Sequence, residues 1–448
     1  MNRSEPLPSL ATIRSARIIV LLLCAYFVVL WVSLAQTADA FPGIVAFRSS
    51  AMWSAALGIA CFALVSVLFA VTRFSVGYFV GFYFYTMIFG YLWLIRFSVL
   101  SYDHRVAMFS IIASCLAFLV PALFIASPVK RPLESSKQRF DLLPLFILLL
   151  AVATLAAGAL YGFRPVAFSE MYKFRGQIQH PAFLRYATGI TTNALLPFAF
   201  ACFVHRKKYL WAAGALSALL LFYPITLTKL TLFAAPWLVF LVVLSRMFTA
   251  RAVVILSLLL PVSVGIVVPF LIKSNMIPPE FGAMYVGTVN SRMIALPSIS
   301  LDAYNEFFAK NPLTYFCQIN LLKLVLTCPY DEPLSIVMSK AYDLGNLNAS
   351  LFATEGIASV GPIFAPLSAL GCGLIIGFAN RLSFGLPATF VIVSAGMLPH
   401  VLLNVPLFTN LLSNGMAVLF LLWYITPRSA FGHEAPTSKG EPTQSGTG

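Results

Sequence analysis

Long apolar runs constrain this chain more than any other feature of its sequence. About twelve of them reach the roughly 18–20 residues that a helix needs to cross the hydrocarbon core of a bilayer. A helix suits that environment because it satisfies its backbone polar groups internally. Hydrophobic residues make up 60% of the 448 residues, and charged residues only 10%. The sequence therefore predicts an all-α, polytopic membrane protein.

The predicted spans define one membrane domain, residues 1–428, followed by a polar tail at 429–448 that we expect to be disordered and cytoplasmic. The two spans that meet at Thr226–Leu230 are joined so tightly that they can also form one interrupted segment. The twelve runs cover approximately residues 16–34, 51–71, 76–95, 106–125, 142–159, 187–204, 210–226, 230–244, 253–272, 357–378, 387–403 and 408–424.

The basic residues set the orientation, because Lys and Arg are retained in short cytoplasmic loops. With the N-terminus inside, sixteen basic residues fall in inner segments and eight in short outer segments. Both termini are therefore predicted to be cytoplasmic. This bias explains most of the net charge of +14, so the charge does not indicate a nucleic-acid partner.

Two outer segments are long enough to build a site, residues 161–186 and residues 273–356. The first mixes aromatic residues and His180 with a cluster of cations. Such a mixture suits a loop that binds phosphate through charge-assisted hydrogen bonds, although the same cations can instead neutralise lipid headgroups. The cations are Arg164, Lys173, Arg175 and Arg185.

Lys229 lies among hydroxyl side chains in the short link Thr226–Thr231. An ammonium group near membrane depth is costly, so it usually faces a cavity or a partner. Lys229 is thus a candidate second anion contact, and the alternative is that it extends to the surface. His400 and Asn404, near the outer end of a later span, can line a cavity or serve in packing.

The long outer loop contains a predicted helix between Pro297 and Pro312. Ser298 and Ser300 are available as N-caps, and the helix has an apolar face formed by Leu301, Tyr304 and Phe308. Asp302 and Glu306 are one turn apart, so both carboxylates project from another face. That pair is either the solvated side of the helix or a base within reach of Arg292.

Two of the seven cysteines, Cys317 and Cys328, fall in this long loop. A continuous helix would hold them roughly 16 Å apart, too far for a disulfide. They form a disulfide if a turn lies between them, and otherwise they stay free.

Several stretches together resemble bacterial oligosaccharide repeat-unit polymerases, the Wzy-type enzymes of O-antigen and exopolysaccharide synthesis. Where this family commonly shows an aspartate after paired tyrosines, the chain has Tyr304-Asn305-Glu306. The first half of the chain agrees in hydropathy and in its arginine-bearing outer loop. The stretches that carry the resemblance are residues 290–297, residues 303–308, Thr228-Lys229, residues 346–349 with Gly356 and Gly361, and residues 404–410 with Gly415.

The resemblance implies glycosyl transfer between two undecaprenyl-diphosphate-linked oligosaccharides at the periplasmic face of the bacterial inner membrane. Positioned cations would stabilise the diphosphate as it leaves, without metal or cofactor. We expect Arg175 and Arg292 to be catalytic, with Glu306 as the first candidate for the base. The further base candidates are Asp302, Glu355 and His180, and the expected substrate-binding residues are Arg164, Lys229, Tyr304, His180 and Asp302.

Two other functions remain open at this point. An O-antigen ligase would pass the same kind of donor to a lipid-A core. A transporter or flippase usually carries ionisable residues near the bilayer centre, whereas the intramembrane candidates here are Lys229 and His400, both near outer ends. For a polymerase, the expected partners are the lipid-linked glycans, the bilayer, a chain-length regulator and a flippase.

Overall fold

The computed structural model describes residues 10–167, 170–177, 180–319, 322, 325–343 and 347–431, with the side chains of residues 10–15, 172 and 175 excepted. Within these ranges the chain is helical and has no strand, apart from one isolated bridge between Val45 and Ser98. The all-α prediction is confirmed. The predicted tail at 429–448 lies outside the described residues from position 432 onward.

The helices named below follow one another with the longest connecting stretch at residues 311–333, after α15, and with shorter stretches after α1, α5, α6 and α16. In chain order they are α1 Leu10–Ala38, η1 Ser49–Ala51, α2 Met52–Ala63, η2 Leu64–Ser66, α3 Val67–Val71, α4 Val76–Leu94, α5 His104–Phe124, α6 Lys137–Tyr161, α7 Met171–Arg175, α8 Ala182–Ile190, η4 Thr191–Leu195, α9 Leu196–His205, α10 Tyr209–Leu221, α11 Tyr223–Thr226, α12 Lys229–Met247, α13 Ala250–Lys273, α14 Pro279–Val286, η5 Gly287–Ala295, α15 Leu296–Lys310, α16 Leu334–Tyr342, η7 Phe352–Ala358, α17 Ser359–Ser383, α18 Ala388–Ser394, α19 Leu398–Asn404, α20 Leu407–Leu412, α21 Met416–Ile425 and η8 Arg428–Phe431.

Ten helical segments of the described chain are long and apolar enough to cross a membrane. They match the first ten predicted runs. The last two predicted spans differ, because each is divided into two short helices, α18 with α19 and α20 with α21. Pro399 stands in the first turn of α19, and Gly415 begins α21 in a left-handed conformation, with a φ of 81°. Both residues interrupt regular helical hydrogen bonding.

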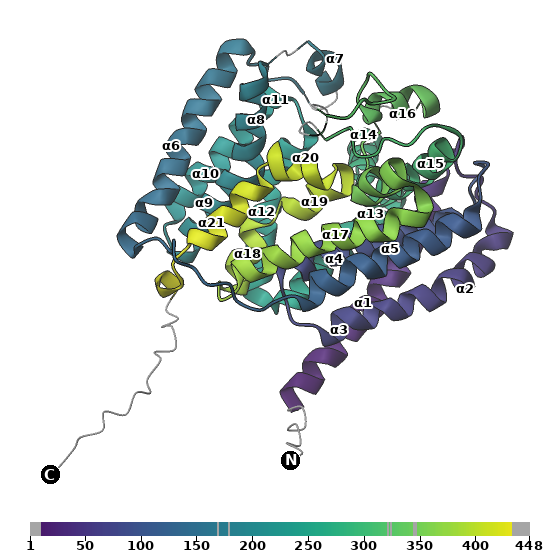
Figure 1. Ribbon diagram of the computed structural model, residues 1–448, viewed down its shortest axis with the longest axis horizontal. Helices are drawn as coiled ribbons and strands as arrows, with labels where there is room; N and C mark the ends of the chain where they lie inside the picture. Colours follow the sequence, from purple (N-terminus) through teal and green to yellow (C-terminus); the bar gives the residue numbers. More distant parts are fainter. Residues whose placement is uncertain are drawn as a thin grey trace.

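The two ends of the helix bundle differ in what they carry (Figure 1). The start of α1 and the short helix η8 lie at one end, which we call the terminal face. α7 and α16 lie at the opposite end, the loop face, together with the long segments before α8 and η7. Both described chain ends are thus on one side and both long loops on the other. This matches the predicted relative topology, and the cytoplasmic assignment stays a prediction from charge.

α4 is the centre of the bundle, because all of its 19 residues are buried. Neighbouring helices hydrogen-bond to it at several levels. Asn380 of α17 accepts from the Gly77 amide at 2.7 Å, and the Tyr83 hydroxyl lies 2.9 Å from the Ser257 hydroxyl of α13. Such side-chain hydrogen bonds between helices are common where hydrocarbon supplies no other partner.

α5 and α17 pack closely along their lengths. The reason is local: a Cβ atom at Gly373 would lie 2.5 Å from the Phe118 carbonyl oxygen, and one at Gly377 would lie 2.9 Å from the Pro121 carbonyl oxygen. Small residues at the interface allow two helix backbones to approach in this way.

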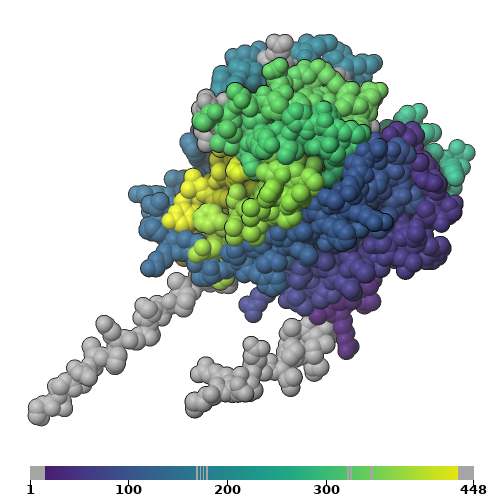
Figure 2. Space-filling model, turned by 45° about the vertical axis from the view of Figure 1, so that its right-hand side comes forward, coloured from purple at the N-terminus to yellow at the C-terminus, as the bar shows by residue number. Residues whose placement is uncertain are grey.

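The long outer segment forms a cover on the loop face, where Figure 2 shows the green residues around position 300 spread over the upper end. α14, η5 and α15 follow one another without a break. Asn290 fixes this helix by donating to the Ser33 hydroxyl of α1 at 2.8 Å and to the Val262 carbonyl of α13 at 3.1 Å. Farther along, Ser298 donates to the Met87 carbonyl of α4 at 2.8 Å.

Ser298 and Ser300 are not the helix caps that the sequence suggested. Both hydroxyls donate to carbonyls one turn back, at Ile294 and Leu296, each at 2.8 Å. No cap is required there, because η5 runs directly into α15 and satisfies the amides at its start. The helix begins at Pro279 rather than at Pro297.

Cys317 and Cys328 are joined by a disulfide, with their Cα atoms 5.4 Å apart. The turn that this requires lies between them, where the amides of Val325 and Leu326 donate to the Leu322 carbonyl at 3.0 and 2.8 Å. The disulfide alternative is therefore the one that the structure contains.

Candidate functional site

The first outer loop folds against α11, the short helix that precedes Lys229. The Arg164 amide donates to the Pro224 carbonyl at 3.0 Å. His180 Nε2 donates to the Ile225 carbonyl at 3.1 Å, and the Tyr223 hydroxyl donates to the Val166 carbonyl at 3.2 Å. Two segments that are about fifty residues apart in sequence thus meet at the loop face. They bring Arg164 and His180 to the residues that precede Lys229.

Arg164 and His180 keep unused hydrogen-bonding capacity at this junction. The Arg164 guanidinium donates to Gln177 Oε1 at 2.5 Å and lies 5.6 Å from the centre of the Phe174 ring. A guanidinium has five N–H donors, so this bond occupies only part of it. His180 Nδ1 is buried and has no partner among the described residues. The side chain of Arg175 lies outside the described part of the structure.

Lys229 is the first residue of α12, directly after the N-cap Thr228. Three threonine hydroxyls form a cluster beside it. Thr231 Oγ1 lies 2.8 Å from Oγ1 of both Thr226 and Thr228, and Leu227 closes the turn with a φ of 45°. Lys229 is half-buried. A lysine at this position and the amides of a helix N-terminus each favour negative charge near the start of α12.

α12 continues from Lys229 into a contact with α19. The Trp237 ring meets the His400 ring edge to face, with 4.5 Å between ring centres. The Tyr83 ring of α4 also contacts His400, with 5.2 Å between ring centres. His400 therefore packs between two aromatic rings. Asn404 donates back to the His400 carbonyl at 3.2 Å, whereas His400 Nε2 is buried without a partner among the described residues.

Glu355 lies inside a membrane helix, whereas the sequence placed it ahead of the span. The candidate membrane span begins at Phe352 and is kinked at Gly361, where φ is 72° and ψ is 172°, and Glu355, ahead of the kink, is only 1% exposed. Its carboxylate accepts from the Thr354 hydroxyl at 2.6 Å and from the Phe408 amide at 3.1 Å. The candidate spans thus contain a buried carboxylate, that of Glu355. The sequence did not predict this, because the apolar run starts at residue 357.

Tyr304 packs next to Glu355, since α15 lies against η7. Burial raises the pKa of the Tyr304 hydroxyl, and the nearby Glu355 carboxylate raises it further. Tyr304 is 1% exposed. Residues 303–308 and the stretch at Gly356 both carry the family resemblance. They are therefore close to each other, with the Tyr304 hydroxyl near the Glu355 carboxyl group.

Asp302 and Glu306 have different surroundings, although they are one turn apart. Asp302 is buried, and it accepts hydrogen bonds from the Ser98 hydroxyl at 2.7 Å and from the Tyr102 hydroxyl. Burial raises the pKa of its carboxyl group, and the hydrogen bonds from Tyr102 and Ser98 oppose that rise only in part. Asp302 is thus not on a solvated face. It anchors α15 to the connection between α4 and α5.

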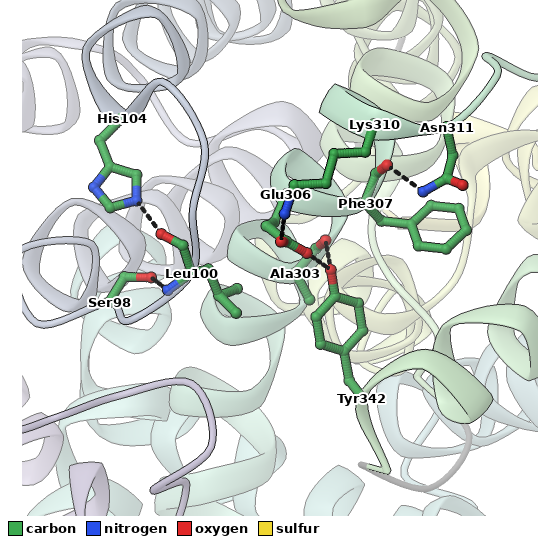
Figure 3. A network of polar contacts seen from close by, with 9 residues as sticks. All are labelled: Ser98, Leu100, His104, Ala303, Glu306, Phe307, Lys310, Asn311 and Tyr342. Carbon is green, nitrogen blue, oxygen red and sulfur yellow. Dashed lines mark hydrogen bonds and ion pairs between the residues drawn. The ribbon is translucent and has the colours of Figure 1, made fainter.

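Glu306 forms an ion pair with Lys310 one turn later and accepts a hydrogen bond from the Tyr342 hydroxyl of α16 (Figure 3). Burial alone would raise the pKa of Glu306, but the hydrogen bonds from Lys310 and Tyr342 outweigh it and lower that pKa. The side chain is 17% exposed. Glu306 is therefore a carboxylate at neutral pH with partial access from the loop face.

Arg292 is exposed in η5, and within the described chain its guanidinium makes no hydrogen bond or ion pair. It stands fourteen residues before Glu306 in an uninterrupted helix, a separation of about 20 Å at 1.5 Å per residue. The structure does not bring Arg292 to Glu306 or to Asp302. Within the described residues, Arg292 is an exposed, unpaired cation of the helix formed by η5 and α15.

Among the described residues, no group of three or more His, Cys, Asp or Glu side chains is arranged to hold a metal ion. No protein-family model, no curated protein and no solved structure matches this chain. What is established is a multi-pass helical membrane protein with ten candidate spans.

Proposed function

We propose that this chain joins undecaprenyl-diphosphate-linked oligosaccharide repeat units by glycosyl transfer on the loop face of a bacterial inner membrane. The observation that carries the proposal is the docking of the first outer loop on α11, just before the start of α12. It places Arg164 and His180 beside the segment that ends in Lys229. The chemistry of that junction suits a phosphate-bearing ligand at the membrane surface.

In the proposed reaction, an acceptor hydroxyl attacks the anomeric carbon of the donor glycan. The bond from that carbon to the diphosphate oxygen breaks, and polyprenyl diphosphate leaves with the electron pair. Cations that contact the departing diphosphate stabilise the transition state more than the ground state. We assign that role to Arg164 and Lys229, with Arg175 and Arg292 as further cations on the same face.

The acceptor hydroxyl must lose its proton as the new bond forms. Glu306 is the first candidate to receive that proton, because the contacts that lower its pKa keep it ionised, and its side chain is partly open. Asp302 is enclosed by its two hydroxyl partners. Tyr304 and Asp302 then serve to hold α15, and with it Glu306, in place.

The test uses a strain in which this chain is the only source of polymer, with chain length displayed on a gel. Replacing Lys229, Arg164, Arg292 or Glu306 singly by alanine should shorten the polymer toward single repeat units. Lys340→Ala is the matched control, because Lys340 is also a loop-face cation but is paired with Glu332 at 2.6 Å. Unchanged polymer in all four variants would contradict the proposal.

The same strain separates the competing functions. Loss of a polymerase leaves single repeat units on the final acceptor, whereas loss of a ligase leaves long chains on polyprenyl diphosphate. Loss of a flippase would leave lipid-linked repeat units inaccessible from outside the cell. A chain-length regulator and a flippase are the expected working partners.

A further inference from the structure

A second charged region lies on the opposite side of the molecule, at the terminal face. There the ends of α9 and α12 and the start of α18 surround a cavity of about 320 Å³. Lys207 and Arg246 line it, together with His205 and Ser245. No aspartate or glutamate is among the lining residues. A cavity of this size is within the range of small-molecule sites.

The two lining cations are available for a ligand. Lys207 lies in the tight turn between α9 and α10, with a φ of 57°, and within the described chain its ammonium group forms no ion pair. Among the described residues, the Arg246 guanidinium hydrogen-bonds only to the Tyr209 hydroxyl, at 3.4 Å, and it lies 5.9 Å from the centre of the Tyr209 ring. Arg206, next to Lys207, differs because it is paired with Asp141 at 3.1 Å.

The deeper wall of the cavity is apolar and is formed by residues such as Val242 and Val393 of the membrane helices. The Ser245 hydroxyl is buried and has no partner among the described residues. A cationic rim, an unpaired hydroxyl donor and an apolar wall together suit a ligand with an anionic phosphate and an attached hydrocarbon part.

We propose that this cavity binds a phosphate-bearing anion through Lys207, Arg246 and Ser245, and that an anionic phospholipid headgroup supplies it. The apolar wall favours the lipid as the source over a free phosphate. The cavity is at the terminal face and not at the loop face. A test of lipid binding there therefore does not depend on the proposed glycosyl transfer.

The experiment measures lipid retained by the full-length purified protein in native mass spectrometry, with phosphatidylglycerol and phosphatidylcholine supplied in equal amounts. The wild type should retain phosphatidylglycerol preferentially. The double variant Lys207→Ala/Arg246→Ala should lose roughly tenfold or more of that preference, as expected when charged hydrogen-bond donors are removed. Lys208→Ala is the matched control, because Lys208 belongs to the same turn but does not line the cavity.

A separate arm distinguishes the two sources of phosphate. If inorganic phosphate raises the melting temperature of the wild type but not of the double variant, and no lipid preference is seen, the site takes a soluble phosphate. Equal retention of both lipids, with no phosphate effect that depends on Lys207 and Arg246, would overturn the proposal. The variant Lys207→Arg/Arg246→Lys keeps both charges, so it should keep binding, and it shows whether the alanine variant failed through misfolding.

Discussion

The Glu355 carboxylate accepts a hydrogen bond of 3.1 Å from the backbone amide of Phe408. This contact joins the start of the tenth membrane helix to the start of α20, across a sequence separation of 53 residues. An amide at a helix start needs an acceptor from outside the helix, and the buried carboxylate supplies it. The start of α20 is thereby tied to η7.

Glu355→Gln and Glu355→Ala should therefore differ in stability. Glutamine keeps an acceptor for the Phe408 amide, whereas alanine removes that acceptor; the Thr354 hydroxyl keeps the Ser350 carbonyl as a partner, at 2.9 Å. The cost of such a loss is about 1–3 kcal/mol. Thermal unfolding in detergent measures it, and equal melting temperatures for the two variants would show that the contact does not stabilise the fold.

Asp302 and Glu306 should give stability with opposite pH dependence. Burial raises the pKa of Asp302 above its ordinary value of 3.8. The folded state therefore favours the protonated form, and the contribution of Asp302 falls as the pH rises through the raised pKa. Hydrogen bonds to Lys310 and Tyr342 outweigh burial and lower the pKa of Glu306 below 4.5, so its contribution is present above that value and is lost in acid.

Melting curves between pH 4 and pH 8 for the wild type, Asp302→Asn and Glu306→Gln measure this difference. Asp302→Asn should gain stability relative to the wild type as the pH rises. Glu306→Gln should be less stable than the wild type at neutral pH, and the gap should begin to narrow as the pH falls below 4.5. Parallel curves for all three proteins would contradict both assignments.

Arg428 should hold the terminal face together. Its guanidinium donates to the carbonyls of Trp423, Thr426 and Leu382 at 2.6–2.7 Å. Burial, followed by the charge of Arg131, lowers the pKa of Arg428 to about 9. Lysine cannot span these carbonyls, because it lacks the planar fork of donors.

Both Arg428→Lys and Arg428→Ala should thus lower the melting temperature, by an amount that reflects about 1–3 kcal/mol for the unpaired carbonyls. Arg73→Ala, at an exposed position on the same face, is the control. A lysine variant as stable as the wild type would show that charge alone suffices.

The disulfide between Cys317 and Cys328 tests which side the loop face occupies. Disulfides persist in oxidising compartments, so neither thiol should react with a maleimide until the protein is reduced. In Cys317→Ser, the remaining Cys328 should react with a membrane-impermeant maleimide added to intact spheroplasts. Labelling only after the membrane is permeabilised would place this loop in the cytoplasm and reverse the topology.

The sequence predicted the membrane helices and their relative direction, because hydropathy and the distribution of Lys and Arg are local signals. It also brought Lys229 and the cationic outer loop into one hypothesis. That these two segments dock on each other depends on carbonyl contacts at Pro224 and Ile225, and backbone acceptors leave no trace in residue type.

The burial of Asp302 and the position of Glu355 could not be predicted from the sequence, because they depend on contacts between distant segments. The sequence allowed Asp302 to be one of two solvated carboxylates. It is instead buried, because it accepts hydrogen bonds from the Ser98 and Tyr102 hydroxyls, about 200 residues earlier in the chain. Glu355 looked like a loop residue because the apolar run begins after it. Glu355 lies near Tyr304 because α15 packs against η7. The helix continues through Pro297 where α15 packs against α4.

The most direct test of the proposed glycosyl transfer uses the purified protein in nanodiscs with one substrate, a polyprenyl-diphosphate-linked repeat unit, in the presence of EDTA. We predict polymers of several repeat units, with one polyprenyl diphosphate released for each new linkage, and loss of both products in Lys229→Ala. Intact donor after incubation with folded wild-type protein would contradict the central claim that the loop face carries out this transfer.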